Sequence, residues 1–588
     1  KFTEIMKKLA LIPFLFLVLI TFQGNYSTSK LSRLMETVVG RMSDTDSVLC
    51  WVFFKDKGPS TEKYLKNPSL VVTQKSIERR RKFKSEQNLI DETDLPVYSG
   101  YIDEFQKMGL QVKGKSKWLN SVSMYVAKSE VLKIEKLPFV SHLDLVVRFS
   151  KKYSSDLVEA PSTDQTKMIL DNKDKFDLDY GQSLTQNQMM SVPAMHNLGI
   201  TGAGVTVCVL DAGFNNLQHE SFSQMTILDK WDFVNNDGGV GDSLDMGSGS
   251  HGTNVLSAIG GYKPGKLIGP AYGASYLLAK TENTDSETPI EEDNWIAGIE
   301  WADSLGADLA TSSLGYLEYD PPFQSYTWQD MDGNTARITR AADLAVSKGI
   351  AVFVSAGNEG MDATHNTLGA PADGDSVISV GAVDASRARA YFSSVGLTVD
   401  GRIKPDIMAM GQGVRVASSY TLNGYSQSSG TSFSCPLAAG VGALILSQRP
   451  NISPVELANS LRSTADNASN PNREYGWGII NGLAALNSIP AMNIEDAAQT
   501  PSDIRVYGNY PNPFNPSTKI DFELSSISEL TIDLYNATGE KVKRLGRGFF
   551  EPGRHTIDVE AGGLNSGVYF VKLKSSKSSK VVKIVLSK

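Results

Sequence analysis

Apolar and polar positions follow two different spacings through the middle of the chain. Short continuous apolar runs, such as 205–210, 350–355 and 377–383, predict strands that are buried on both faces. Between them lie longer segments with apolar residues at helical spacing, including 292–305 and 338–348. Alternating strands and helices of this kind predict an α/β fold, in which a parallel sheet is covered by helices on both faces.

The pattern changes on either side of this α/β region, which we place at residues 185–490. Residues 47–149 mix strand and helix patterns and predict a small α+β domain. Residues 504–588 contain short alternating strands separated by turn residues, which predicts a small β-sandwich. The polar stretches 150–184 and 491–503 lack apolar periodicity and are interpreted as linkers, the first of them cleavable.

The chain carries an export signal near its start. Met6, Lys7 and Lys8 precede an apolar stretch, 9–22, which is shorter than the roughly 20 residues that a membrane span needs. We therefore expect a signal peptide at residues 6–27 and no membrane span in the mature form.

Composition excludes some functions. The net charge of the 588-residue chain is −8 and no long basic tract is present, so nucleic acid is not expected as a partner. The strongly basic segment 73–83 is interpreted as a solvated helix face. Three cysteines, Cys50, Cys208 and Cys435, are too few for a disulfide framework, and we expect Cys208 and Cys435 to be small buried hydrophobes.

Candidate chemistry begins at Ser432, which precedes an apolar, Ala- and Gly-rich run that predicts a buried helix. A helix N-terminus favours developing negative charge, so a nucleophile would be well placed there. On its own, however, such a serine is more often an N-cap.

Three further motifs change this interpretation. Asp211 follows a predicted buried strand, His251 opens a predicted helix, and Asn358 lies in a Gly-flanked turn after another strand. Each of these residues alone would be read as a turn former or a tolerated polar residue. Together and in this order, over about residues 199–488, they resemble the subtilisin-like serine proteases, whose chain order is Asp, His, Ser.

The resemblance implies roles for these residues. His251 would be the base that takes the proton of Ser432, and Asp211 would orient the imidazole and stabilise its charged form. Asn358 would donate its side-chain amide to the oxyanion, with the Ser432 backbone N–H as second donor. The substrates implied are polypeptides, and no catalytic cofactor is expected.

Ser313, Leu314 and Gly315 match the segment that pairs with extended substrate in this family. The sequence also departs from the usual family pattern. Ala212 follows the aspartate where Ser or Thr is usual, and residues 433–435 (Phe-Ser-Cys) replace the usual Met and small residues. Neither departure removes a catalytic group.

An insertion at residues 316–335 carries an acidic cluster, Asp330 to Asn334. The cluster could bind a structural calcium ion. Because it lacks the distal Glu of an EF-hand loop, a solvated loop is the favoured interpretation.

The flanking regions carry resemblances of their own. Residues 47–149 resemble the inhibitory propeptide of subtilisin-like proteases, which makes the chain's own propeptide a partner. The Tyr-Pro-Asn-Pro-Phe-Asn-Pro opening at 510–516 and the Ser-Gly-Val-Tyr-Phe motif at 566–570 resemble the sorting domain of type IX secretion substrates. This resemblance implies contact with the secretion machinery and export through the periplasm to the surface or exterior of a Gram-negative bacterium.

Alternative functions are weighed against this one. A catalytically inactive relative that acts as a surface adhesin would be expected to have lost at least one of the four catalytic positions, and none is lost here. A serine esterase of another fold would need a closing Gly in its nucleophile motif, which Gly430 to Ser434 lacks. A carbohydrate-binding sandwich at 504–588 is less favoured than a sorting domain.

Overall fold

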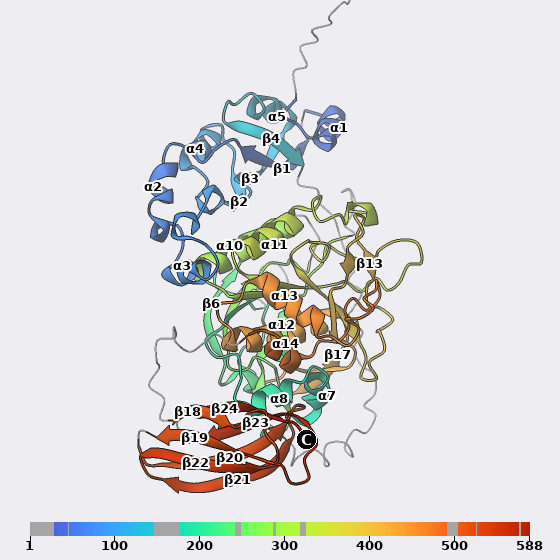
Figure 1. Ribbon diagram of the computed structural model, residues 1–588. Helices are drawn as coiled ribbons and strands as arrows, with labels where there is room; N and C mark the ends of the chain where they lie inside the picture. The colour runs from blue at the N-terminus through green and yellow to red at the C-terminus, as the bar shows by residue number, and fades with distance from the viewer. Residues whose placement is uncertain are drawn as a thin grey trace, which may run out of the picture.

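The structure is a computed structural model that describes residues 29–44, 46–145, 176–241, 249–285, 290–317, 325–490, 504–524, 526–575 and 578–588. The predicted signal peptide, most of the first predicted linker and the second linker lie outside these residues. Figure 1 shows an N-terminal domain (29–145), a central domain (176–490) and a C-terminal domain (504–588) stacked in this order.

The N-terminal domain is built on a four-stranded antiparallel sheet with helices on one face. Its strands, in sheet order, are β2 (Val112–Ser116), β3 (Ser121–Ala127), β1 (Ser47–Phe54) and β4 (Val140–Leu145). Its main helices are α1 (Arg33–Arg41), α4 (Ser99–Lys107) and α5 (Lys128–Ile134). In β1, alternate residues serve the two faces: Cys50 and Val52 join the core under the helices, whereas Trp51 and Phe53 form a second cluster that contacts Ile290 of the central domain.

Between β1 and α4 the chain makes an excursion that carries α2 (Thr61–Leu65) and α3 (Gln74–Arg81). The prediction of a solvated basic face for this segment is wrong for two of its residues. Arg79 and Arg80 are buried, with 2% and 0% of their surface exposed, because they form ion pairs with Asp303 of the central domain. Only Arg81 and Lys82 of the basic run remain exposed.

The central domain confirms the predicted parallel sheet. In sheet order its seven strands are β15 (Ile407–Met410), β12 (Ile378–Val383), β11 (Ala351–Ser355), β10 (Leu309–Ser312), β5 (Thr206–Asp211), β9 (Ser275–Lys280) and β6 (Thr226–Asp232). The edge strands β6 and β15 were not predicted, because β6 is largely exposed and polar and β15 is only four residues long.

Helices cover both faces of this sheet, as predicted. One face packs against α9 (His251–Gly260) and α12 (Thr431–Gln448), and the other against α10 (Ile290–Leu305) and α11 (Arg337–Ser347). Along β5 the residues alternate accordingly: Val207 and Val209 join the first core, whereas Cys208 and Leu210 join the second. Short helices α7 (Leu184–Gln188), α8 (Val192–Asn197), α13 (Pro454–Ser463) and α14 (Gly482–Ser488) complete the domain.

Helix α12 is the central element of the domain. Within the described part of the chain it is the one helix long and apolar enough to span a membrane, but 89% of that stretch is buried inside the protein. Its small residues explain the close packing, since a Cβ on Gly442 would stand 2.8 Å from the Phe353 ring. Its N-terminus therefore has a fixed position relative to the sheet.

The C-terminal domain is a sandwich of two antiparallel sheets. The three-stranded sheet contains β18 (Ile504–Tyr510), β19 (Ser517–Leu524) and β22 (Gly553–Glu560). The four-stranded sheet contains β21 (Lys541–Phe550), β20 (Ser528–Asn536), β23 (Gly567–Lys574) and β24 (Ser579–Leu586). The sandwich lies against α8 (Figure 1). Lys572 of β23 forms an ion pair with Asp177 of the central domain at 3.1 Å.

Candidate active site

The parallel sheet brings the predicted site residues to one edge. Asp211 is the last residue of β5, Ser313 follows β10, and Asn358 follows the neighbouring strand β11. Because the strands are parallel and adjacent, their carboxyl ends meet at the same edge, where binding sites of such sheets lie.

Asp211 and His251 form a hydrogen-bonded pair. The Nδ1 atom of His251 lies 2.7 Å from Oδ1 of Asp211, whose side chain is fully buried. A carboxylate can only accept, so the imidazole carries its proton on Nδ1 and leaves Nε2 as the basic nitrogen. The close approach of α9 to the turn after β5 requires Gly252, because a Cβ there would stand 2.4 Å from the Gly213 carbonyl oxygen.

Ser432 lies in the first turn of α12, as predicted, and is 6% exposed. Its hydroxyl donates to the carbonyl of Ser313 at 3.4 Å, and the Ser313 hydroxyl donates to the carbonyl of Ser432 at 2.8 Å. The ring of Phe433, the residue that departs from the family pattern, has its centroid 5.8 Å from that of His251. The serine and histidine motifs therefore meet at the same place.

The orientation of the Asn358 side chain is fixed by a residue for which the sequence suggested no role. Its Oδ1 accepts the backbone N–H of Thr431 at 2.9 Å and the Thr431 hydroxyl at 3.0 Å. Because a backbone N–H can only donate, the atom facing it must be the amide oxygen. The amide nitrogen of Asn358 is thereby turned away from Thr431 and is available as a donor.

The turn that holds Asn358 is also fixed from outside. The Ser394 N–H donates to the carbonyl of Gly357 at 3.0 Å, and its hydroxyl accepts the N–H of Glu359 at 3.1 Å. Ser394 is fully buried. No local motif marks it in the sequence, because it comes from a loop 36 residues further along the chain than Asn358.

The segment from Ser313 to Gly315 follows β10 at the same edge. Leu314 is 7% exposed, and a Cβ on Gly315 would meet nothing within 4 Å. The space beside Gly315, where a side chain would stand, is therefore open.

The acidic cluster of the insertion makes local contacts. Asp332 accepts the N–H groups of Asn334 and Thr335, and Asp330 accepts the N–H of Thr327. Over the described ranges no group of three or more His, Cys, Asp or Glu residues could hold a metal ion. Burial raises the pKa of the Cys435 thiol, in agreement with its interpretation as a buried hydrophobe.

Comparison with known families agrees with these features. Residues 202–478 match the Subtilase family of S8 peptidases, residues 49–165 match the Peptidase S8 propeptide domain of Bacteroidota, and residues 509–587 match the secretion system C-terminal sorting domain. The last two matches indicate a secreted or cell-surface protein of the Bacteroidota.

Individual relatives cover the same region. Subtilisin DY of Bacillus licheniformis is 34% identical over 49% of this chain and 92% of its own length. Subtilisin NAT of Bacillus subtilis subsp. natto is 30% identical over 65% of this chain and 85% of its own length. Subtilisin of Bacillus pumilus is 34% identical over 50% of this chain and 96% of its own length. The chain therefore belongs to the subtilisin family of serine endopeptidases, with a propeptide domain before its catalytic domain and a sorting domain after it.

Proposed function

We propose that the chain is a secreted endopeptidase that cuts extended polypeptides with Asp211, His251 and Ser432 as a catalytic triad. The observation that carries the proposal is the 2.7 Å contact between His251 Nδ1 and Asp211, beside a serine in the first turn of a buried helix. Nε2 of His251 takes the proton of Ser432 as its oxygen attacks the peptide carbonyl carbon, and then returns that proton to the leaving amine. Asp211 stabilises the imidazolium that exists between these two steps, and water then releases the acyl group by the same route.

Asn358 and the Ser432 backbone N–H are the proposed oxyanion donors. Thr431 holds the Asn358 side chain through two hydrogen bonds, so the amide need not reorganise as charge develops on the substrate oxygen. The segment from Ser313 to Gly315 is the proposed partner of the extended substrate backbone. No catalytic cofactor is part of the proposal, and a structural calcium ion at residues 330–334 would be detected as a lower melting temperature after chelation.

The test is Ser432→Ala in the full chain, expressed with no other protease present. We expect it to fold, to lose peptide hydrolysis by about a millionfold, and to lose labelling by a fluorophosphonate. It should also accumulate as an uncut precursor, because we propose that Ser432 cuts the chain between the N-terminal and central domains. Asn358→Ala is the matched variant, with an expected loss of about 100- to 1000-fold in kcat and little change in KM.

Two outcomes would contradict the proposal. A wild-type chain that binds no fluorophosphonate would favour an inactive adhesin. Normal processing of the Ser432→Ala chain would show that another protease matures it.

The C-terminal domain is proposed to direct the chain to the secretion machinery. Deleting residues 504–588 should leave an active protease that accumulates in the periplasm. Equal extracellular activity from truncated and full-length chains would contradict this role.

A further inference from the structure

The edge of the central domain opposite the active site carries a buried charge, Asp303, near the C-terminal end of α10. This end of the helix leads directly into the amino end of β10, whereas the active site lies at the carboxyl ends of the strands. The 16 residues of α10 span about 24 Å at 1.5 Å per residue, so the two places are well separated.

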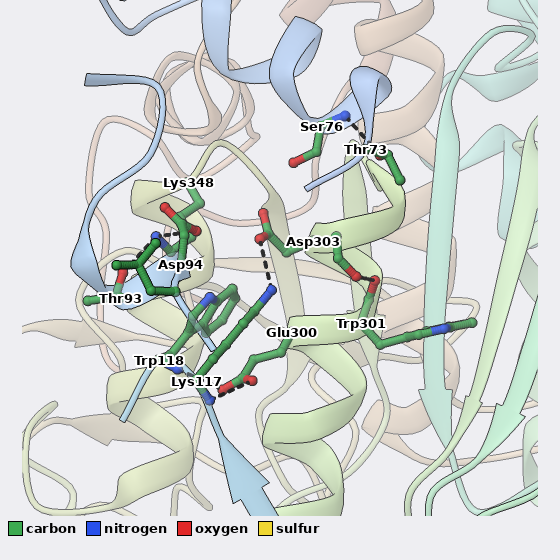
Figure 2. A network of polar contacts seen from close by, with 12 residues as sticks. Thr73, Ser76, Thr93, Asp94, Lys117, Trp118, Glu300, Trp301, Asp303 and Lys348 are labelled. Atoms are coloured by element: carbon green, nitrogen blue, oxygen red, sulfur yellow. Dashed lines mark hydrogen bonds and ion pairs between the residues drawn. The ribbon is translucent and has the colours of Figure 1, made fainter. Parts of the chain in front are cut away.

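Every cation within 4 Å of Asp303 in the described structure comes from the N-terminal domain. Arg79 donates to Oδ1, and Arg80 donates to both oxygens at 2.9 and 2.7 Å. Lys117 points towards Asp303 (Figure 2) and lies 4.0 Å away. Asp303 is fully buried. Burial alone would raise the pKa of this carboxyl, but Arg79 and Arg80 hold it below its ordinary value.

The central domain also offers carbonyl groups to the same arginine. Arg79 donates to the carbonyl of Ala307 at 2.5 Å and to that of Lys348 at 3.3 Å. Helix α3 can come this close because residue 306 is a glycine with φ of 85°, where a Cβ would stand 2.7 Å from the Lys75 side chain. We call Asp303 and the carbonyls of Ala307 and Lys348 the arginine site.

The central domain also supplies a buried cation to the N-terminal domain. Lys348 of the central domain is fully buried and donates to Thr93 at 2.8 Å, and it lies 2.9 Å from Asp94 of the N-terminal domain (Figure 2). Arg80 connects the two halves, because it also binds Asp94 at 2.9 Å. Each domain therefore neutralises a buried charge of the other, an arrangement that selects one specific partner.

We propose that the arginine site is a second binding site for the propeptide, separate from the active site, and that it recognises the paired arginines Arg79 and Arg80. Its occupant is the chain's own excursion between β1 and α4. The site holds the propeptide on the enzyme after the covalent connection is cut. It does not depend on which residues form the catalytic triad.

The test separates retention from catalysis. A recognition sequence for a site-specific protease is inserted between residues 150 and 170 of the full Ser432→Ala chain, which is then cut with that protease. Timed size-exclusion chromatography gives the half-time with which the N-terminal domain leaves. Thermal unfolding of each uncut chain shows whether a variant has folded.

Two variants remove one partner each, Arg80 from the propeptide and Asp303 from the central domain. Arg80→Met and Asp303→Asn should each release the N-terminal domain at least about 100-fold faster. Arg80→Met removes the cation that binds both oxygens of Asp303, and Asp303→Asn leaves the buried Arg79 without its carboxylate. Arg81→Met is the matched control. Arg81 follows on the same helix, and its one ion pair within the described part of the chain is with Glu86. Both side chains are exposed, so release should match the parent chain.

The double variant completes the test. Arg80→Met should add little in the Asp303→Asn background if the two residues act on each other. Release of Arg80→Met and Asp303→Asn at the rate of Arg81→Met would overturn the proposal, and so would fully additive effects. If Arg80→Met does not fold, the Asp303→Asn chain gives the answer alone, since its substitution lies in the central domain.

Discussion

Helix α10 carries a buried carboxylate under the propeptide near each of its ends, and the surroundings of the two carboxylates are opposite in kind. Asp303, near the C-terminal end, is surrounded by cations of the propeptide. Asp293, near the N-terminal end, is buried under β1 and β3, and among the described residues neither of its oxygens has an ion pair or a hydrogen bond. The Trp51 indole N–H and the Ser123 hydroxyl lie near it and oppose the rise of its pKa, but neither is within hydrogen-bond geometry of its oxygens.

The pKa values reflect this difference. Burial raises the pKa of Asp293 to about 8, with Glu292 adding to the rise and Arg337 opposing it. At Asp303 burial is outweighed by Arg79 and Arg80, and the pKa falls below its ordinary value. One end of the helix is thus neutralised by a proton and the other by arginines.

The two ends should respond to pH with opposite signs. When the propeptide leaves, Asp293 meets water and its pKa returns towards 4, so docking takes up a proton. The contribution of Asp293 to the stability of the docked propeptide is complete below about pH 4 and is lost as the pH rises towards 8. The contribution of Asp303 to docking is present above about pH 4 and is lost only in acid. At neutral pH, therefore, the end of α10 that carries Asp293 holds the propeptide less strongly than the end that carries Asp303.

Replacing Asp293 by Asn gives the largest expected effect on this comparison. The neutral amide can be buried without a proton, so the cut propeptide should leave about 100-fold more slowly at pH 8. The same release assay measures this, with Asp303→Asn as the variant of opposite sign. A faster release from Asp293→Asn would show that the carboxylate is ionised in the complex.

The pH dependence of the parent chain is the next largest effect. Release should become about tenfold faster between pH 6.5 and 8.0, because docking then requires a proton from increasingly alkaline solution. His142 of β4, whose pKa burial lowers, titrates below this range. The slope should become smaller in Asp293→Asn but not vanish, because burial lowers the pKa of Lys57 to about 8, within this range. A parent chain whose release rate does not change with pH would contradict the proposed difference between Asp293 and Asp303.

The smallest effect concerns the rim of the arginine site. Lys82 lies 3.7 Å from Asp308, and both side chains are partly exposed. Lys82→Met should therefore accelerate release only about twofold, and added salt should reduce even that difference. If Lys82→Met accelerated release as much as Arg80→Met, the rim of the arginine site, and not buried Asp303, would hold the propeptide.

The same contrast explains what could be predicted from the sequence. The proposed catalytic residues were recognisable because each lies in a short local motif at a strand end or helix start, and the sheet topology brings those positions together. The burial of Arg79 depends on Asp303, which lies 224 residues further along the chain, and no residue near α3 indicates this partner. A basic helix with few apolar residues is usually solvated, and only the packing of a second domain overrides this.

Strand prediction failed for a related reason. β6 is a mostly exposed edge strand with polar residues on both faces, so it lacks the continuous apolar run that marked β5 and β11. Ser394 was missed because its effect on Asn358 acts through backbone groups, which carry no residue signature.

The three cysteines have a practical consequence for studying this enzyme. All are buried and unpaired, and burial raises the pKa of each thiol. Folding therefore involves no oxidation step among them, and a thiol reagent reacts only when the surrounding structure opens. Cys50 lies in the propeptide, Cys208 and Cys435 lie in the catalytic domain, and the sorting domain has none. Alkylation followed by peptide mapping can thus time the opening of the first two domains separately, without an introduced label.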